Sequence, residues 1–105
     1  MSEEGFLRRH SKAEAQKLIR EILSEVINVL SGGRHFNQEL KAYGAQMRDV
    51  LNCLKKGMIY EEPEPHPKTN YWTYRVKGKT IEGDDLTVVI NIPAEEQKIV
   101  LITVF

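Results

Sequence analysis

Apolar residues in the first half of the chain recur at steps of three and four, which is the spacing of one helix face. The first such stripe predicts a helix over residues 12–30, and Ser11-Lys12-Ala13-Glu14 forms a capping box at its start. Its members are Ala15, Leu18, Ile19, Ile22, Val26, Val29 and Leu30. Ser31-Gly32-Gly33 follows, and we expect the helix to stop there because glycine tolerates the left-handed backbone of a helix end.

Two shorter helices are predicted after it. Residues 34–43 place their apolar side chains on one face. A third apolar stripe begins at Met47, and Gly57 closes that helix. Lys55 and Lys56 complement the negative end of its dipole.

After Gly57 the apolar positions alternate, with the period of a β-strand. The predicted strands are residues 58–60, 71–77, 86–92 and 98–105. Residues 61–70 hold three prolines, which cannot donate to a strand ladder, so this segment is expected to be a loop. Residues 82–85 and 93–97 carry turn signals.

This order of elements predicts one α+β domain of 105 residues. Two to three N-terminal helices would pack on one face of a three- to four-stranded antiparallel sheet. The expected segments are a flexible N-terminus at 1–10, a helical part at 11–57 and an antiparallel meander at 58–105.

Charge and composition limit the classes of function. The formal net charge is zero, whereas a sequence-blind nucleic-acid binder is usually basic throughout, so any nucleic-acid site must be local. Cys53 is the single cysteine, which excludes an intrachain disulfide, and we expect a structural role for it. Without a signal peptide or a long apolar run, the protein is expected in the cytoplasm, with no membrane contact.

One segment departs from the neutral charge of the whole chain. Residues 68–79, KTNYWTYRVKGK, hold four positive charges, no negative charge and three aromatic residues. Period two divides the strand within it into two faces. Trp72, Tyr74 and Val76 fall on the apolar face, and the other face carries Tyr71, Thr73, Arg75 and Lys77.

Metal-independent RNA cleavage needs a base for the 2′-hydroxyl proton, cations for the phosphate and an acid for the leaving oxygen. Arg75, Lys77 and Lys79 supply cations, and Tyr71 supplies a ring on which a base can stack. His35 is the best candidate for the acid or base, although a histidine hydrogen-bonded in the helix–sheet seam is an equal alternative. His10 and His66 are expected on the surface. No pair of histidines has metal-ligand spacing, so neither a metal nor another cofactor is expected.

The order RHFNQELKAYG, MRDVLNCLKKGMI, YWTYRVKG, LTVVINI and IVLITVF resembles a group of small bacterial domains of unknown function. That group is usually placed beside the RelE/ParE-like and MqsR-like toxins of toxin–antitoxin modules, within the metal-independent ribonuclease fold shared with barnase. The resemblance covers about residues 34–105. It implies helices on one side of the sheet and an active surface on the other.

The resemblance also implies roles for individual residues. His35, Arg75 and Thr103 would be catalytic, and Tyr71, Lys77, Lys79 and Arg34 would bind RNA. The implied partners are RNA, which could be ribosome-bound mRNA, and a cognate antitoxin protein. The chain departs from the toxins in its neutral charge and its long first helix.

Two other functions stay open. The chain could be a non-catalytic protein-binding domain of the same fold, in which the first helix, residues 12–30, docks a partner or forms a homodimer. It could also be an RNA-binding module that does not cleave. Growth inhibition that depends on Arg75 and His35 would distinguish the toxin from both.

Overall fold

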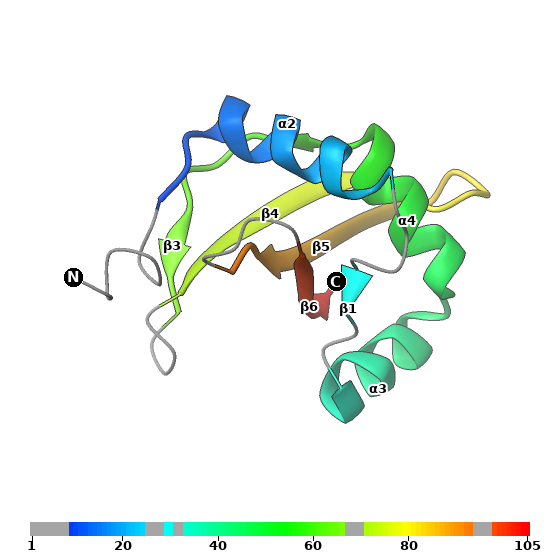
Figure 1. Cartoon of the computed structure of the whole chain (residues 1–105). Coiled ribbons are helices and arrows are strands. Elements are labelled where there is room, and N and C mark those ends of the chain that lie inside the picture. The colour runs from blue at the N-terminus through cyan, green and yellow to red at the C-terminus, as the bar shows by residue number, and fades with distance from the viewer. Residues whose placement is uncertain (1–8, 25–28, 31–32, 67–70, 94–97) are drawn as a thin grey trace.

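Three helices and six strands make up the described part of this computed structural model, which comprises residues 9–24, 29–30, 33–66, 71–93 and 98–105 (Figure 1). The helices are α2 (Lys12–Ile22), α3 (Gly33–Tyr43) and α4 (Met47–Lys56). The strands are β1 (Val29–Leu30), β2 (Met58–Ile59), β3 (Glu64–Pro65), β4 (Trp72–Lys79), β5 (Asp85–Asn91) and β6 (Ile99–Val104).

The strands form one sheet in the order β1-β6-β5-β4-β2, with β3 also paired to β4. β2, β3 and β5 run antiparallel to β4, β6 runs antiparallel to β5, and β1 runs parallel to β6. Helices precede the antiparallel strands, so the predicted α+β class is confirmed. The proline-rich segment departs from the prediction, because Glu64–Pro65 pairs with β4; proline is tolerated at such a sheet edge.

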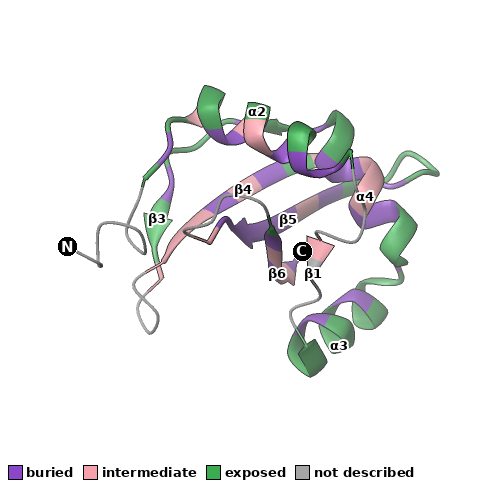
Figure 2. Ribbon diagram, viewed as in Figure 1, coloured by how far each residue is buried: buried purple, intermediate pink, exposed green. Residues whose placement is uncertain are grey.

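A single apolar cluster joins all three helices to one face of the sheet. Ile19 of α2, Phe36 of α3 and Val50 of α4 meet Val76 and Leu101 of the strands, and each is at most 1% exposed. Figure 2 shows the outward sides of the helices exposed and the central strands largely buried. The predicted core face of β4 is confirmed, since Tyr74 and Val76 are each 1% exposed.

The first helix is shorter than predicted. α2 begins at the capping box, in which the Ser11 hydroxyl accepts the Glu14 N–H, but it ends at Ile22. The expectation of a helix through Leu30 was wrong, because Val29–Leu30 forms β1 beside Ile99 and Val100 of β6. Val26, Ser31 and Gly32 lie outside the described residues.

Arg9 and His10, which precede α2, contact the sheet. His10 was expected on the surface, but it is only 4% exposed, and its backbone N–H donates to the hydroxyl of Tyr74 at 2.9 Å. The Arg9 guanidinium lies 5.5 Å from the centre of the Trp72 ring. These contacts were invisible in the sequence because they join positions more than sixty residues apart. No helix among the described residues is both long and apolar enough to cross a bilayer.

A buried carboxylate ties the start of α4 to the turn between β4 and β5. Asp49 Oδ1 accepts the N–H of Ile81 at 2.9 Å, and Oδ2 accepts the N–H of Gln46 at 2.8 Å. The hydrogen bond from Ile81, followed by that from Gln46, holds the pKa of the Asp49 carboxyl below its usual range.

This lowered pKa gives a prediction for stability against pH. The stabilisation is complete above the unfolded-state pKa of about 3.9, and it is lost as the pH falls through the lower folded-state pKa. Asp49→Asn is therefore expected to be less stable near neutral pH and to lose this part of the acid dependence. Urea midpoints of both proteins near neutral pH and below about pH 4 check it; an identical acid dependence would contradict it.

Candidate nucleic-acid interface

A β-bulge in β6 decides which way Thr103 faces. Val89 of β5 pairs with Thr103, whereas the next residue of β5 pairs with Leu101, so Ile102 is the extra residue. Leu101 and Val104 are both buried in the core. The bulge therefore reverses the order in which successive residues of β6 face the core and the opposite side. As a result, Thr103 lies on the side of the sheet opposite the core cluster. We call this side the open face.

The open face brings two of the three predicted catalytic residues into one row. Arg75 pairs with Val89, and Val89 pairs with Thr103, so the three residues lie across neighbouring strands. Neighbouring strands are about 4.8 Å apart, which places Arg75 and Thr103 about 10 Å apart at their backbones. Val89 is buried, whereas Arg75 and Thr103 are half-buried and can be reached from solvent.

Carboxylates from the proline-rich segment contact the cations of this face. Arg75 Nη1 lies 3.1 Å from Glu61 Oε1, and its Nη2 lies 3.5 Å from Glu64 Oε1. Lys77 Nζ lies 3.1 Å from Glu61 Oε2. Hydrogen bonding from Lys77, then from Arg75, keeps the pKa of the Glu61 carboxyl below its usual range. No local pattern predicted this contact, because the acids and the cations belong to different segments.

A cavity of about 620 Å³ lies at one end of the open face. Lys77 and Lys79, both predicted to bind RNA, line it together with Lys56 from the end of α4. The rings of Tyr60 and Phe105 also line it, and these residues are 63% and 55% exposed. Exposed rings beside cations are typical of surfaces that stack bases and hold phosphates.

Two of the three cations that line this cavity already have acidic partners, Lys77 in Glu61 and Lys79 in Asp85. Lys79 Nζ lies 2.5 Å from Asp85 Oδ1, and this hydrogen bond raises the pKa of Lys79 and lowers that of Asp85. No acidic side chain within the described ranges pairs with Lys56. The sequence did not indicate Lys56, Tyr60 or Phe105, because each stands at the end of a different element.

His35 and Arg34 lie apart from this row. Both are exposed in the first turn of α3, which packs on the core through Phe36 and Leu40. The alternative of a histidine held in the helix–sheet seam was wrong, since His35 is exposed. In the part of the chain that is described, no hydrogen bond or ion pair joins His35 to Arg75 or Thr103.

His66 lies nearer to the open face than the sequence suggested. Glu64 pairs with Thr73, and the His66 N–H donates to the Tyr71 carbonyl at 2.7 Å. Residues two apart on a strand share a face, so His66 and Tyr71 continue the side that carries Thr73 and Arg75. Both are half-buried.

Asn91 is a polar residue of this face without a full set of partners. It pairs with Thr73 across the strands and is 5% exposed. Among the residues described, no donor reaches its side-chain Oδ1. A buried acceptor without a donor is costly, so the Asn91 side chain lowers the stability of the fold relative to a fully hydrogen-bonded one.

Comparison with known proteins identifies a family. A model described as "Domain of unknown function (DUF4258)" matches residues 33–105. The match begins at the first residue of α3, so α2 and β1 lie outside it. No curated protein and no solved structure matches the chain. Across the described residues, no three histidine, cysteine or acidic side chains are grouped to hold a metal ion.

Proposed function

The chain belongs to the DUF4258 family, whose function is unknown, and we propose that it is a metal-independent endoribonuclease of the toxin–antitoxin type. The observation that supports this best is the row of Arg75, Val89 and Thr103 on the open face. A guanidinium and a hydroxyl on one row can hold the same phosphate group. The cavity beside the row offers rings for the neighbouring bases.

The proposed reaction is an attack by the RNA's own 2′-hydroxyl. The 2′-oxygen forms a bond to phosphorus while the bond to the 5′-oxygen breaks, leaving a 2′,3′-cyclic phosphate and a 5′-hydroxyl. Arg75 would stabilise the negative charge that grows on the phosphate, and Thr103 would donate a hydrogen bond to it. A base must take the 2′-hydroxyl proton and an acid must protonate the leaving 5′-oxygen. The resemblance to the toxins gives one of these roles to His35, which stands on α3 away from the row, and water would fill the other.

Purified protein tests this function directly. Fluorescein-labelled single-stranded RNA should be bound and cut, whereas DNA of the same sequence should stay whole because it lacks the 2′-hydroxyl. Contacts from about three cations predict a slope of about −2 for log affinity against log salt. Binding without cleavage would favour the RNA-binding module, and no binding would favour a protein-binding domain.

Arg75→Ala is expected to reduce the cleavage rate at least about 100-fold, the typical cost of removing one charge-stabilising donor. The salt slope should become shallower by about 0.7, because one phosphate contact is lost. Lys41→Ala, an exposed cation on α3, is the matched control and should leave both quantities unchanged. Undiminished cleavage in both Arg75→Ala and His35→Ala would exclude the mechanism.

Glu61 competes with RNA in this proposal, since its carboxylate contacts both Arg75 and Lys77. Glu61→Gln removes that charge while preserving the shape of the side chain. RNA affinity is expected to rise about two- to fivefold, in line with the small free energy of an exposed ion pair. Fluorescence anisotropy at low salt measures it; a fall in affinity would show that Glu61 positions Arg75 for RNA instead.

A further inference from the structure

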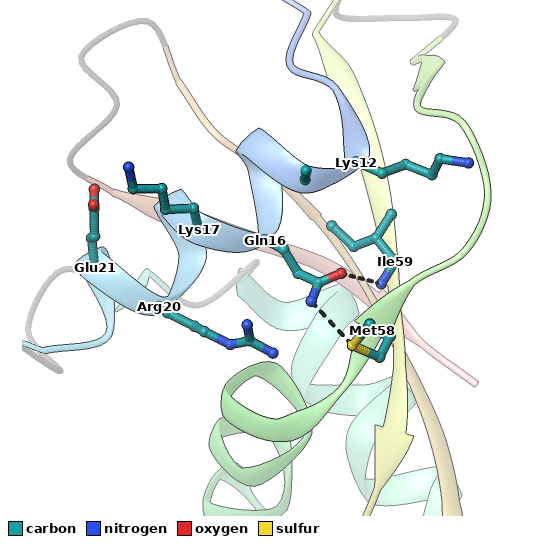
Figure 3. Close-up of a pocket in the computed structure, with 8 residues that line it drawn as sticks. Lys12, Gln16, Lys17, Arg20, Glu21, Met58 and Ile59 are labelled. Atoms are coloured by element: carbon teal, nitrogen blue, oxygen red, sulfur yellow. Dashed lines mark hydrogen bonds between the residues drawn. The ribbon is translucent and has the colours of Figure 1, made fainter.

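A second cavity lies between α2 and β2, and Met58 lines both this cavity and the one at the end of the open face. It has a volume of about 660 Å³, and its walls come from the outer side of α2 and from Met58 and Ile59. Figure 3 shows Gln16 of α2 pointing at Met58 and Ile59, with Arg20 one turn further along the helix. We call this cavity the α2 groove.

Side chains of α2 form hydrogen bonds with backbone groups at this edge of the sheet. Gln16 Oε1 accepts the N–H of Ile59 at 2.9 Å, and Gln16 Nε2 donates to Met58 Sδ at 3.1 Å. Arg20 Nε donates to the carbonyl of Lys55 at 3.4 Å. An added strand would need the Ile59 N–H that Gln16 already holds. Any occupant of the groove must therefore be recognised through side chains.

The charges of the groove are mostly positive. Lys12, Lys17 and Arg20 line it, and Glu21 is the acid among the lining residues. Lys12 already has an acidic partner, since its Nζ lies 3.3 Å from Glu62. Across the described ranges, no acid lies in ion-pair range of Lys17 or Arg20. These two cations sit three residues apart, on adjoining positions of the helix surface.

The groove also has an exposed apolar contact surface. Met58 is 43% exposed, and its flexible thioether can adapt to an apolar side chain placed on it. Arg20 Nε donates to the Lys55 carbonyl, and among the described residues no hydrogen bond occupies the two outer nitrogens of its planar guanidinium, which can bind a carboxylate. A ligand with carboxylates beside an apolar side chain would complement these features.

We propose that the α2 groove docks an acidic, amphipathic segment of a partner protein. Lys17 and Arg20 bind its carboxylates, and Met58 contacts its apolar side chain. Because α2 lies outside the family match, this surface is an addition of the chain to the DUF4258 domain, suited to selecting its own partner. The site does not depend on whether the open face binds or cleaves RNA.

The test uses the full chain and a short fluorescein-labelled helical peptide. This peptide carries glutamate on one face of the helix and leucine on the other. The same peptide with glutamine in place of every glutamate is the control ligand. The acidic peptide should bind in anisotropy titrations, and the glutamine peptide should bind at least about tenfold more weakly. Equal affinity for the two peptides, or no binding of either, would overturn the proposal.

Variants locate the site. Lys17→Glu combined with Arg20→Glu should weaken the acidic peptide at least about tenfold, and Lys41→Glu on α3 should not change its affinity. Met58→Gln should weaken the peptide without altering its salt dependence. Circular dichroism of each variant confirms that α2 is folded, and undiminished binding in the folded double variant would overturn the proposal.

Other occupants give different results in the same samples. Self-association that the double variant abolishes, with no peptide binding, would assign the groove to a second copy of this chain. Displacement of the peptide by single-stranded RNA, in a protein that carries Arg75→Ala, would assign it to nucleic acid. Either result would overturn the peptide proposal and would leave the cleavage assay on the open face unaffected.

Discussion

Phe36→Ala is expected to lower the free energy of unfolding by about 3–5 kcal/mol, the usual cost of emptying a buried phenylalanine site. Phe36 is fully buried and belongs to the cluster that joins α3 to the sheet. α3 has eleven residues, and a helix that short is marginal without tertiary packing, so the lost contact also loosens the helix. Urea unfolding, analysed by linear extrapolation, measures the change.

The neighbouring residue supplies the control for Phe36→Ala. His35 is exposed on the same turn, and His35→Ala should stay within about 0.5 kcal/mol of the wild type. A loss below about 1 kcal/mol for Phe36→Ala would show that α3 does not pack on the sheet in this way. A stable His35→Ala protein also permits the proposed catalytic role of His35 to be tested without loss of fold.

Gly57→Ala is expected to lower the free energy of unfolding by about 3 kcal/mol or more. This loss is at or beyond the upper end of the usual cost of overpacking a core. A methyl group at this position would lie 2.5 Å from the Cys53 carbonyl oxygen and 2.7 Å from that of Lys77, and both are backbone atoms. The backbone of Gly57, with φ of −77°, suits alanine, so the cost is purely steric. Thermal and urea unfolding check it.

Gly83→Ala is the matched comparison, because its φ of +99° strains alanine while no atom lies within 4 Å of the added carbon. Its cost is expected to be about 1–2 kcal/mol. Equal losses for the two variants would contradict the close approach of α4 to β4. That approach also encloses Cys53, whose pKa burial raises to about 11, in agreement with a structural thiol.

The sequence alone predicted the elements whose pattern is local. Helices at 34–43 and from Met47 to Gly57 follow from apolar spacing and terminal glycines, and the structure agrees. The core face of β4 follows from alternation within one strand. In each case the signal lies within about ten residues, where side-chain spacing and backbone propensity act together.

Elements that depend on distant pairing were not predictable. The stripe that includes Val29 fits a helix as well as a strand, and only the parallel pairing with β6 decides between them. The facing of Thr103 depends on the bulge at Ile102, which the mostly apolar ending of the chain does not reveal. The contact of Glu61 with Arg75 crosses from one segment to another and has no local pattern.

The candidate site was predicted in part. Arg75 and Thr103 lie on one row of the sheet, and Lys77 and Lys79 line the adjoining cavity; whether these residues act on RNA stays a prediction. His35 stands on α3, away from that row. Two-residue periodicity located the cations correctly, whereas the position of a residue on another helix depends on tertiary packing that spacing along the chain does not encode.

The most direct test of the central claim is induced expression of the chain in a bacterium, with growth and total RNA followed together. Wild type, Arg75→Ala and the control Lys41→Ala should be compared at equal protein levels. The ribonuclease proposal predicts growth arrest with RNA fragmentation for wild type and Lys41→Ala, and normal growth with intact RNA for Arg75→Ala. Normal growth and intact RNA in all three cultures, or equal arrest in all three, would contradict it.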